Sequence, residues 1–269
     1  MAKNRIRVSV EGDPKDEGHV RLTDFLRQLD SVRKALRHTE GLLLHRGNED
    51  SVYYRVIDAH RRSPLTVVLE AVADKSPGLP ARVVGKFLDS IEEIKQRGTI
   101  PTDFDYPTAE AYREITVPQH KHVSALVIGN GKRRMVIDRQ YEQGIKNAIG
   151  PDEFAEGSIT GTLDTVKLHN VTTFEVFPTV GPKRVVCHFQ PAKKEKVKQA
   201  LERYVCVYGR LRYKHWDKFP HAIDASDLDI YPLDDELPKL SELRGMAPDL
   251  TGGLEAHEFL EQVRDAWKT

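Results

Sequence analysis

The sequence predicts an α+β protein. We expect a mostly antiparallel sheet with packed helices in residues 1–150, a small β-barrel in 151–234, and a linker with a C-terminal amphipathic helix in 235–269. The first half contains both apolar runs of β-branched residues and segments in which apolar residues recur at helical spacing. Gly150-Pro151 interrupts this pattern, and mainly β-type runs follow. With 269 residues, 39% of them hydrophobic, the chain is long enough for two folded cores.

Charge and cysteine content narrow the classes of function. Lys plus Arg equals Asp plus Glu at 41 each, so any electrostatic role must be local. Cys187 and Cys206 fall in predicted strands, where buried thiols are common and a disulfide is the alternative. The N-terminus lacks an apolar leader, and no run approaches the ~18 apolar residues that cross a bilayer. We therefore expect a cytoplasmic protein without membrane association.

The first elements are a strand and a long helix. Ile6, Val8 and Val10 alternate with polar residues, which predicts a half-buried strand. Apolar residues then recur at helical spacing from Leu22 to Leu36, with Thr23 as the expected N-cap. The other face of this helix carries Arg27, Arg33, Lys34, Arg37 and His38. We interpret it as a solvated face, with phosphate binding as the alternative.

Two hairpins and two helices complete the first half. Residues 52–59 and 65–72 are rich in β-branched and aromatic residues around a polar turn, which predicts a hairpin. A helix over 83–94 is closed by Gly98, and a shorter one spans 108–115. Residues 123–128 and 135–137 flank Asn130-Gly131, a strong hairpin signal. No catalytic motif is present, and we expect no cofactor and no metal site.

The second half predicts five strands and one helix. The strands are 157–168, 173–177, 185–189, one starting at Tyr204, and 221–231. Gly161 permits the bend that a small barrel requires of its long strand. Val197, Ala200, Leu201 and Tyr204 form the apolar face of a helix after the third strand.

The fourth strand has the clearest alternation. Val205, Val207, Gly209 and Leu211 fall on one face, and the other face mixes tyrosine with arginine. By the order β-β-β-α-β-β and the run Val205-x-Val207-x-Gly209-x-Leu211, residues 157–231 resemble the OB-fold. An SH3-like barrel with an inserted helix gives much the same pattern. The OB resemblance implies single-stranded nucleic acid as a ligand.

Local charge agrees with a nucleic-acid ligand. Residues 183–218 hold eleven Lys or Arg against three Asp or Glu. The loop Lys214–Pro220 joins strands 4 and 5, and in OB-folds this loop commonly borders the ligand groove. The expected nucleic-acid-binding residues are Lys183, Arg184, His188, Tyr208, Arg210, Arg212, Lys214, Trp216, Lys218 and Phe219. In the alternative interpretation, Trp216 and Phe219 cover a barrel end and the cations provide solubility.

The last segment predicts an interaction helix. Leu254, Phe259, Leu260, Val263 and Trp267 share one face, which can dock on the same chain or on a protein partner, including a homodimer. We therefore expect a non-enzymatic, bacterial-type accessory protein that binds nucleic acid within a larger assembly. A scaffold subunit without nucleic-acid contact is the first alternative. A metal-dependent nuclease using Asp227 and Asp229 is the second.

Overall fold

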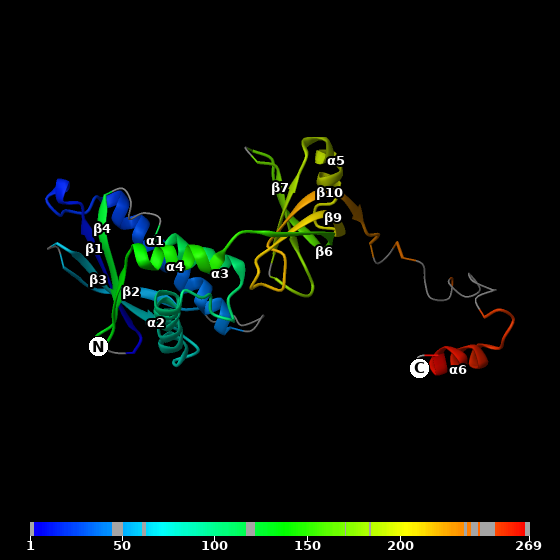
Figure 1. Ribbon diagram of the computed structural model, residues 1–269, viewed down its shortest axis with the longest axis horizontal. Coiled ribbons are helices and arrows are strands. Elements are labelled where there is room, and N and C mark those ends of the chain that lie inside the picture. The colour runs from blue at the N-terminus through cyan, green and yellow to red at the C-terminus, as the bar shows by residue number, and fades with distance from the viewer. Residues whose placement is uncertain are drawn as a thin grey trace.

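The computed structural model describes residues 3–44, 51–60, 63–116, 122–169, 171–182, 184–233, 236–237, 242 and 251–266. Two hydrophobic cores follow one another along the chain, and a last helix lies apart from both (Figure 1). The expected α+β class is confirmed. No helix in this described part of the chain combines the length and apolar character needed to cross a bilayer.

The N-terminal domain is a five-stranded antiparallel sheet with four helices. Its elements are β1 (Arg5–Gly12), α1 (Leu22–Leu43), β2 (Tyr53–His60), β3 (Leu65–Val72), α2 (Leu79–Arg97), α3 (Tyr106–Glu114), β4 (Val123–Gly129), β5 (Arg134–Ile137) and α4 (Arg139–Ile149). The strand order is β2-β3-β1-β4-β5. The part from β1 to β4 has the connectivity of a split βαβ, or ferredoxin-like, arrangement, which β5 and α4 extend.

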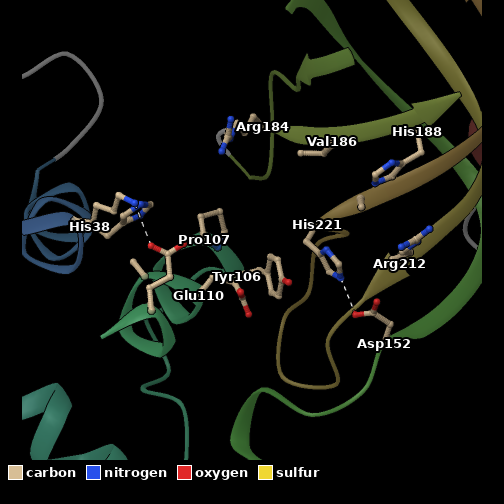
Figure 2. A pocket seen from close by; sticks show the side chains of 14 residues that line it. His38, Tyr106, Pro107, Glu110, Asp152, Arg184, Val186, His188, Arg212 and His221 are labelled. Atoms are coloured by element: carbon tan, nitrogen blue, oxygen red, sulfur yellow. Dashed lines mark hydrogen bonds and ion pairs between the residues drawn. The ribbon is translucent and has the colours of Figure 1, made fainter. Parts of the chain in front are cut away.

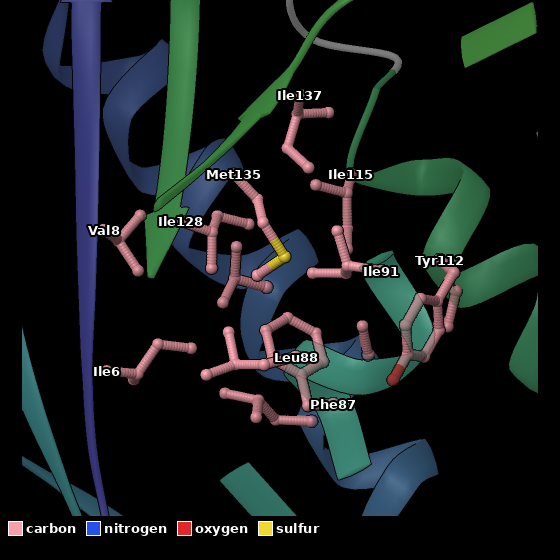
Figure 3. Packing of buried hydrophobic residues seen from close by; sticks show 14 of the residues in the cluster. Ile6, Val8, Phe87, Leu88, Ile91, Tyr112, Ile115, Ile128, Met135 and Ile137 are labelled. Carbon is pink, nitrogen blue, oxygen red and sulfur yellow. The ribbon is translucent and has the colours of Figure 1, made fainter. Parts of the chain in front are cut away.

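One face of this sheet carries the core. Alternation along β1 places Ile6, Val8 and Val10 on the helix side, each fully buried. Figure 3 shows Ile6 and Val8 on β1 facing Phe87 and Leu88 of α2 across this core. All four helices contribute side chains to the same cluster, so they cover one face of the sheet.

The predictions made from local sequence in this domain were partly correct. The hairpin at Asn130 is confirmed: the Asn130 Oδ1 accepts hydrogen bonds from the backbone amides of Lys132 and Arg133, both at 3.0 Å. The expected N-cap at Thr23 is wrong, because the helix begins at Leu22 and Arg21 occupies the cap without a side-chain bond. The helix α4 was not predicted, although Asp138 caps it by accepting from the Tyr141 amide.

The C-terminal domain is a closed five-stranded barrel. Its elements are β6 (Glu153–Lys167), β7 (Thr173–Phe177), β8 (Val185–Phe189), α5 (Lys194–Gln199), β9 (Tyr204–Tyr213) and β10 (Ala222–Ile230). The strands follow the ring β10-β8-β7-β6-β9, in which only the β8–β10 pair is parallel. The long strand β6 closes the ring, because it pairs with β9 over 153–162 and with β7 from Thr162 onward.

A glycine in β6 allows this strand to pair with both β9 and β7. A Cβ at Gly161 would lie 2.5 Å from the Phe177 carbonyl oxygen, so only glycine allows β7 to approach β6 there. The strand also begins four residues earlier than the expected residue 157, because residues from Glu153 to Glu156 pair with β9.

The barrel core follows the alternation of β9. Val205 and Val207 are fully buried and Leu211 is 5% exposed, as the pattern predicts. The inserted helix is shorter than expected: Val197 and Ala200 join the core, but Leu201 is exposed and Tyr204 belongs to β9. Both cysteines are buried free thiols, so the alternative of a disulfide is wrong.

The loop after β9 joins the two domains. The Trp216 ring packs against the N-terminal core, and its Nε1 donates to the Ile149 carbonyl oxygen at 3.2 Å. The buried Lys214 ammonium donates to the Gly150 carbonyl oxygen at 2.8 Å. These two contacts attach the barrel to the end of α4.

Candidate nucleic-acid interface

A cleft lies where the outer face of the barrel meets helices α1 and α3. It encloses a cavity of about 530 Å³, whose walls include Lys34 and His38 of α1, Tyr106 of α3, and His188 of β8. Figure 2 shows Arg184, Val186 and His188 following one another along the barrel wall, with His38 and Tyr106 opposite. Residues far apart in the sequence therefore form one site.

The alternation of side chains along β8 determines which of them line the cleft. Val185, Cys187 and Phe189 point inward and belong to the barrel core. The residues between them, Val186 and His188, therefore face outward and line the cleft. The strand β8 thus contributes one apolar and one polar side chain to the cleft while its alternate residues fill the barrel core.

Glu175 anchors one of the cleft cations. Its carboxylate, 7% exposed, accepts from the Arg184 Nη1 at 2.8 Å and from the Lys167 Nζ at 3.1 Å. Burial raises the pKa of the Glu175 carboxyl, but the hydrogen bonds from Arg184 and Lys167 outweigh it and hold the pKa below its usual value. Arg184 is therefore held in place by a carboxylate that stays charged at neutral pH.

Arg212 is held in a similar way on the neighbouring strands. It lies on β9 and forms an ion pair with Asp224 of β10, including a bond from its Nε to the Asp224 Oδ2 at 3.1 Å. Because Nε and Nη2 engage Asp224, the Arg212 Nη1 is the nitrogen outside this pair. Lys34, on the α1 side, pairs with Glu114 at 3.3 Å and with Asp30 at 3.4 Å.

His221 and Tyr106 form the floor of the cleft. Their rings stack with centroids 4.0 Å apart and planes inclined by 26°. The His221 Nε2 lies 2.9 Å from the Asp152 Oδ1, which also pairs with Lys214 at 2.7 Å (Figure 2 draws the His221 to Asp152 contact). Burial raises the pKa of Tyr106 to about 12. Burial also lowers the pKa of His221, although Asp152 opposes this shift.

A second cavity continues the cleft along α1. It measures about 340 Å³ and shares His38, Pro107 and Arg184 with the first. Its walls add Arg37 from α1 and Phe177 from the end of β7, whose ring is 37% exposed. The cleft therefore presents the exposed aromatic ring of Phe177 and cations from both domains.

The expected nucleic-acid-binding residues divide into separate groups. Arg184, His188 and Arg212 line the cleft. On the outer face of β9, Arg210 stacks its guanidinium 4.0 Å from the Phe154 ring centroid, and Tyr208 is 42% exposed. Lys183 lies outside the described residues.

The loop residues lie at the domain junction or beside it. Lys214 and Trp216 make the contacts with the end of α4 described above. Phe219 is 42% exposed and lies against the turn at Gly181, while Lys218 is exposed. The loop therefore connects the two domains through Lys214 and Trp216, while His215, Lys218 and Phe219 are exposed.

Sequence reasoning missed the contribution of α3. Tyr106 lies 115 residues before its stacking partner His221, so no local pattern links the two. The basic face of α1 was recognised, but only the fold shows that Lys34, Arg37 and His38 face the barrel. Asp105 gave a usable signal, since it caps α3 by accepting from the Thr108 amide at 3.0 Å.

The carboxylates considered for a nuclease are placed differently. Asp227 accepts hydrogen bonds from Lys193 at 2.9 Å and Lys196 at 3.1 Å, which lower its pKa well below the usual range. Within the described ranges there is no group of three or more His, Cys, Asp or Glu side chains arranged to hold a metal ion.

Comparison of this chain with protein-family models, with curated proteins and with solved structures found no match. What the cleft binds must therefore be inferred from its own side chains.

Proposed function

We propose that this chain is a non-enzymatic accessory protein that binds single-stranded nucleic acid in the cleft between its two domains. We further propose that the barrel is of the OB type. Two features support that assignment over an SH3-like barrel: α5 follows the third strand, where the OB-fold places its barrel-closing helix, and the ring contains a parallel pair between the third and fifth strands.

The position of the cleft carries the proposal. OB-folds bind oligonucleotides on the face of their second and third strands, which correspond here to β7 and β8. The cleft borders this face. His188 of β8 and Arg184, directly before β8, line its main cavity, and Phe177 at the end of β7 lines the second one. An accessible aromatic ring beside cations is the combination that stacks a base and contacts its phosphate.

The second domain completes the opposite wall. Arg37, His38 and Lys34 lie on successive turns of α1 and face the barrel across the cleft. A single strand in the cleft would therefore contact cations on both sides. In a double helix the bases are stacked on one another, so their faces are not available to stack on Phe177.

The ion pairs set the expected strength of binding. Arg184 uses only its Nη1 toward Glu175, which leaves Nε and Nη2 for a phosphate oxygen. Because each such cation is already close to a carboxylate, its attraction for phosphate is partly offset. We expect moderate affinity that falls steeply with salt.

A binding titration tests this proposal. Fluorescence anisotropy of a labelled oligothymidylate would be measured against the full chain between 50 and 200 mM salt, with duplex of the same length as a competitor. For wild type we expect log K to fall linearly with log salt, by about 0.7 for each phosphate contact. Arg184→Ala should lower both the affinity and this slope, and Phe177→Ala should lower the affinity without changing the slope.

A matched variant controls for nonspecific charge effects. Lys198→Ala removes an exposed cation of α5 that pairs with Glu195 on the same helix and does not line either cavity of the cleft. It should bind like wild type. Absence of binding at 50 mM salt, or equal loss in Lys198→Ala and Arg184→Ala, would contradict the proposal and favour a scaffold subunit without nucleic-acid contact.

A further inference from the structure

The helix α6 (Ala256–Ala266) lacks a packing surface in the described structure. Figure 1 draws it apart from both domains, and none of its residues belongs to either hydrophobic core. Leu260 is 65% exposed and Val263 is 40% exposed. An isolated helix of 11 residues is marginal in water, because nucleation is costly and few hydrogen bonds follow it. A stable α6 therefore requires a surface for its apolar face.

The N-terminal domain has an uncovered apolar groove. It lies between α1 and the edge strand β2 and encloses about 540 Å³. Its apolar walls include Leu29 and Leu36 of α1, and Tyr54 and Leu69 of the sheet. This groove is separate from the cleft described above, although Arg37 borders both.

Exposed side chains extend the groove along both walls. Leu22 and Leu26 are 71% and 55% exposed and share the helical face of Leu29. On the strand, Val56 is 65% exposed and pairs in register with Leu69. Exposed apolar residues that lie next to one another, unlike single ones, mark an interaction surface.

The dimensions of the groove suit a short helix. The wall that α1 contributes, from Leu22 to Leu36, runs for about 21 Å and includes Asp30 and Arg33 beside its apolar residues, and α6 is about 16 Å long. Val263 follows Phe259 by four residues and Leu260 by three, so these side chains share one helical face, as do Leu22, Leu26 and Leu29. Matching rows of this kind are what allow two helices to pack ridge into groove.

We infer that α6 docks into the groove between α1 and β2 of its own chain. The 22 residues between Leu233 and Ala256 form a tether that can extend over at most about 75 Å. A tether also supplies an effective concentration on the order of 1 mM, so even a weak groove would hold α6. A partner protein or a second copy has no such advantage at micromolar concentration.

Hydrogen exchange of the full-length purified protein tests the inference. Because an undocked α6 is too short to persist, its amides should exchange at nearly the rate of an unfolded peptide. Docking predicts slowing of at least tenfold over residues 256–266, at any protein concentration between 1 and 100 µM. Val56→Asp should abolish the slowing, because it places a charge beside the apolar groove. Val56 is exposed, so its replacement should leave the fold intact.

A matched substitution and a second readout separate the outcomes. Val180→Asp alters a valine on the barrel that is 81% exposed, and should leave the exchange of α6 unchanged. Slowing that grows with protein concentration, together with a dimer mass in sedimentation, would overturn docking in the same chain and indicate a second copy. Absence of slowing at every concentration, or equal slowing in Val56→Asp, would overturn the groove as the docking site.

Discussion

The Nε1 of Trp216 lies 3.2 Å from the carbonyl oxygen of Ile149, to which it donates a hydrogen bond. This bond joins the loop after β9 to the last residue of α4. The two walls of the cleft belong to different domains, so their spacing depends on this junction.

Trp216 should contribute to stability as well as to domain placement. Trp216→Phe keeps an aromatic ring but loses the hydrogen bond, and should cost about 1 kcal/mol. Trp216→Ala also loses the packing of a partly buried ring and should cost about 2 kcal/mol, roughly half the value for a fully buried aromatic. Urea unfolding measures both. Phe219→Ala, with a more exposed ring in the same loop, is the control, and an equal cost there would contradict the assigned role.

Stability should fall as the pH drops below about 6.5, in part because of His221. The pKa of His221 in the folded protein is lower than its unfolded value near 6.5, because burial disfavours the charged ring despite Asp152. The unfolded chain therefore binds more protons below pH 6.5, and folding is disfavoured there. The charged or titratable groups around the ring are Asp152, Lys214, Arg212 and Tyr106.

Replacement of His221 removes its titration, so its contribution to the pH dependence of stability can be measured directly. Urea midpoints of wild type and His221→Gln would be compared between pH 5 and 8. The variant should be less stable at pH 8 but should lose less on acidification to pH 5. Parallel pH curves for the two proteins would show that His221 does not titrate in this window.

Gly209 and Gly157 face each other across β9 and β6, and their replacement should have unequal effects. Gly209 has φ of +155°, and a Cβ there would lie 2.1 Å from the Asp224 carbonyl oxygen. Gly209→Ala should therefore cost about 3 kcal/mol or more. At Gly157 the Cβ would meet the movable end of the Leu211 side chain, and the cost should be about 1 kcal/mol. Thermal unfolding of both variants compares the two losses of stability. A greater loss in Gly157→Ala than in Gly209→Ala would contradict this explanation.

The thiols should be inert in the folded protein. Burial raises the pKa of Cys187, so little thiolate forms at pH 8 and reagents have no access to it. Cys206 is also buried, at 6% exposure. A thiol reagent at pH 8 should label neither residue over minutes, and both after denaturation in urea. Rapid labelling of one thiol in native protein would contradict the burial of that strand.

Periodicity predicted the parts of the fold that depend on neighbouring residues. The alternation from Val205 to Leu211 identified a core face that the structure confirms, because the pleat of a strand alone decides it. The same reasoning missed α4, although Tyr141, Ile145 and Ala148 recur at helical spacing and Asp138 marked its start. The signal was present in the sequence and was not used.

The candidate site was less accessible to sequence reasoning. A loop tryptophan beside cations has the composition of a ligand site, but Trp216 packs on the other domain. Whether an aromatic ring meets a ligand or a domain depends on contacts distant in sequence, such as the one with Ile149. By contrast, the outward direction of His188 follows from strand alternation alone, because it lies between the core residues Cys187 and Phe189.

A hydrogen-exchange footprint with a bound single strand tests the central claim most directly. Saturating oligothymidylate would be added to the full-length protein at 50 mM salt, and amide exchange compared with the free protein. We expect slower exchange in β7, in β8 and in the part of α1 from Lys34 to Leu42, with no change in β2. Protection confined to other surfaces, or no change anywhere at a concentration that saturates binding, would contradict the assignment of the cleft.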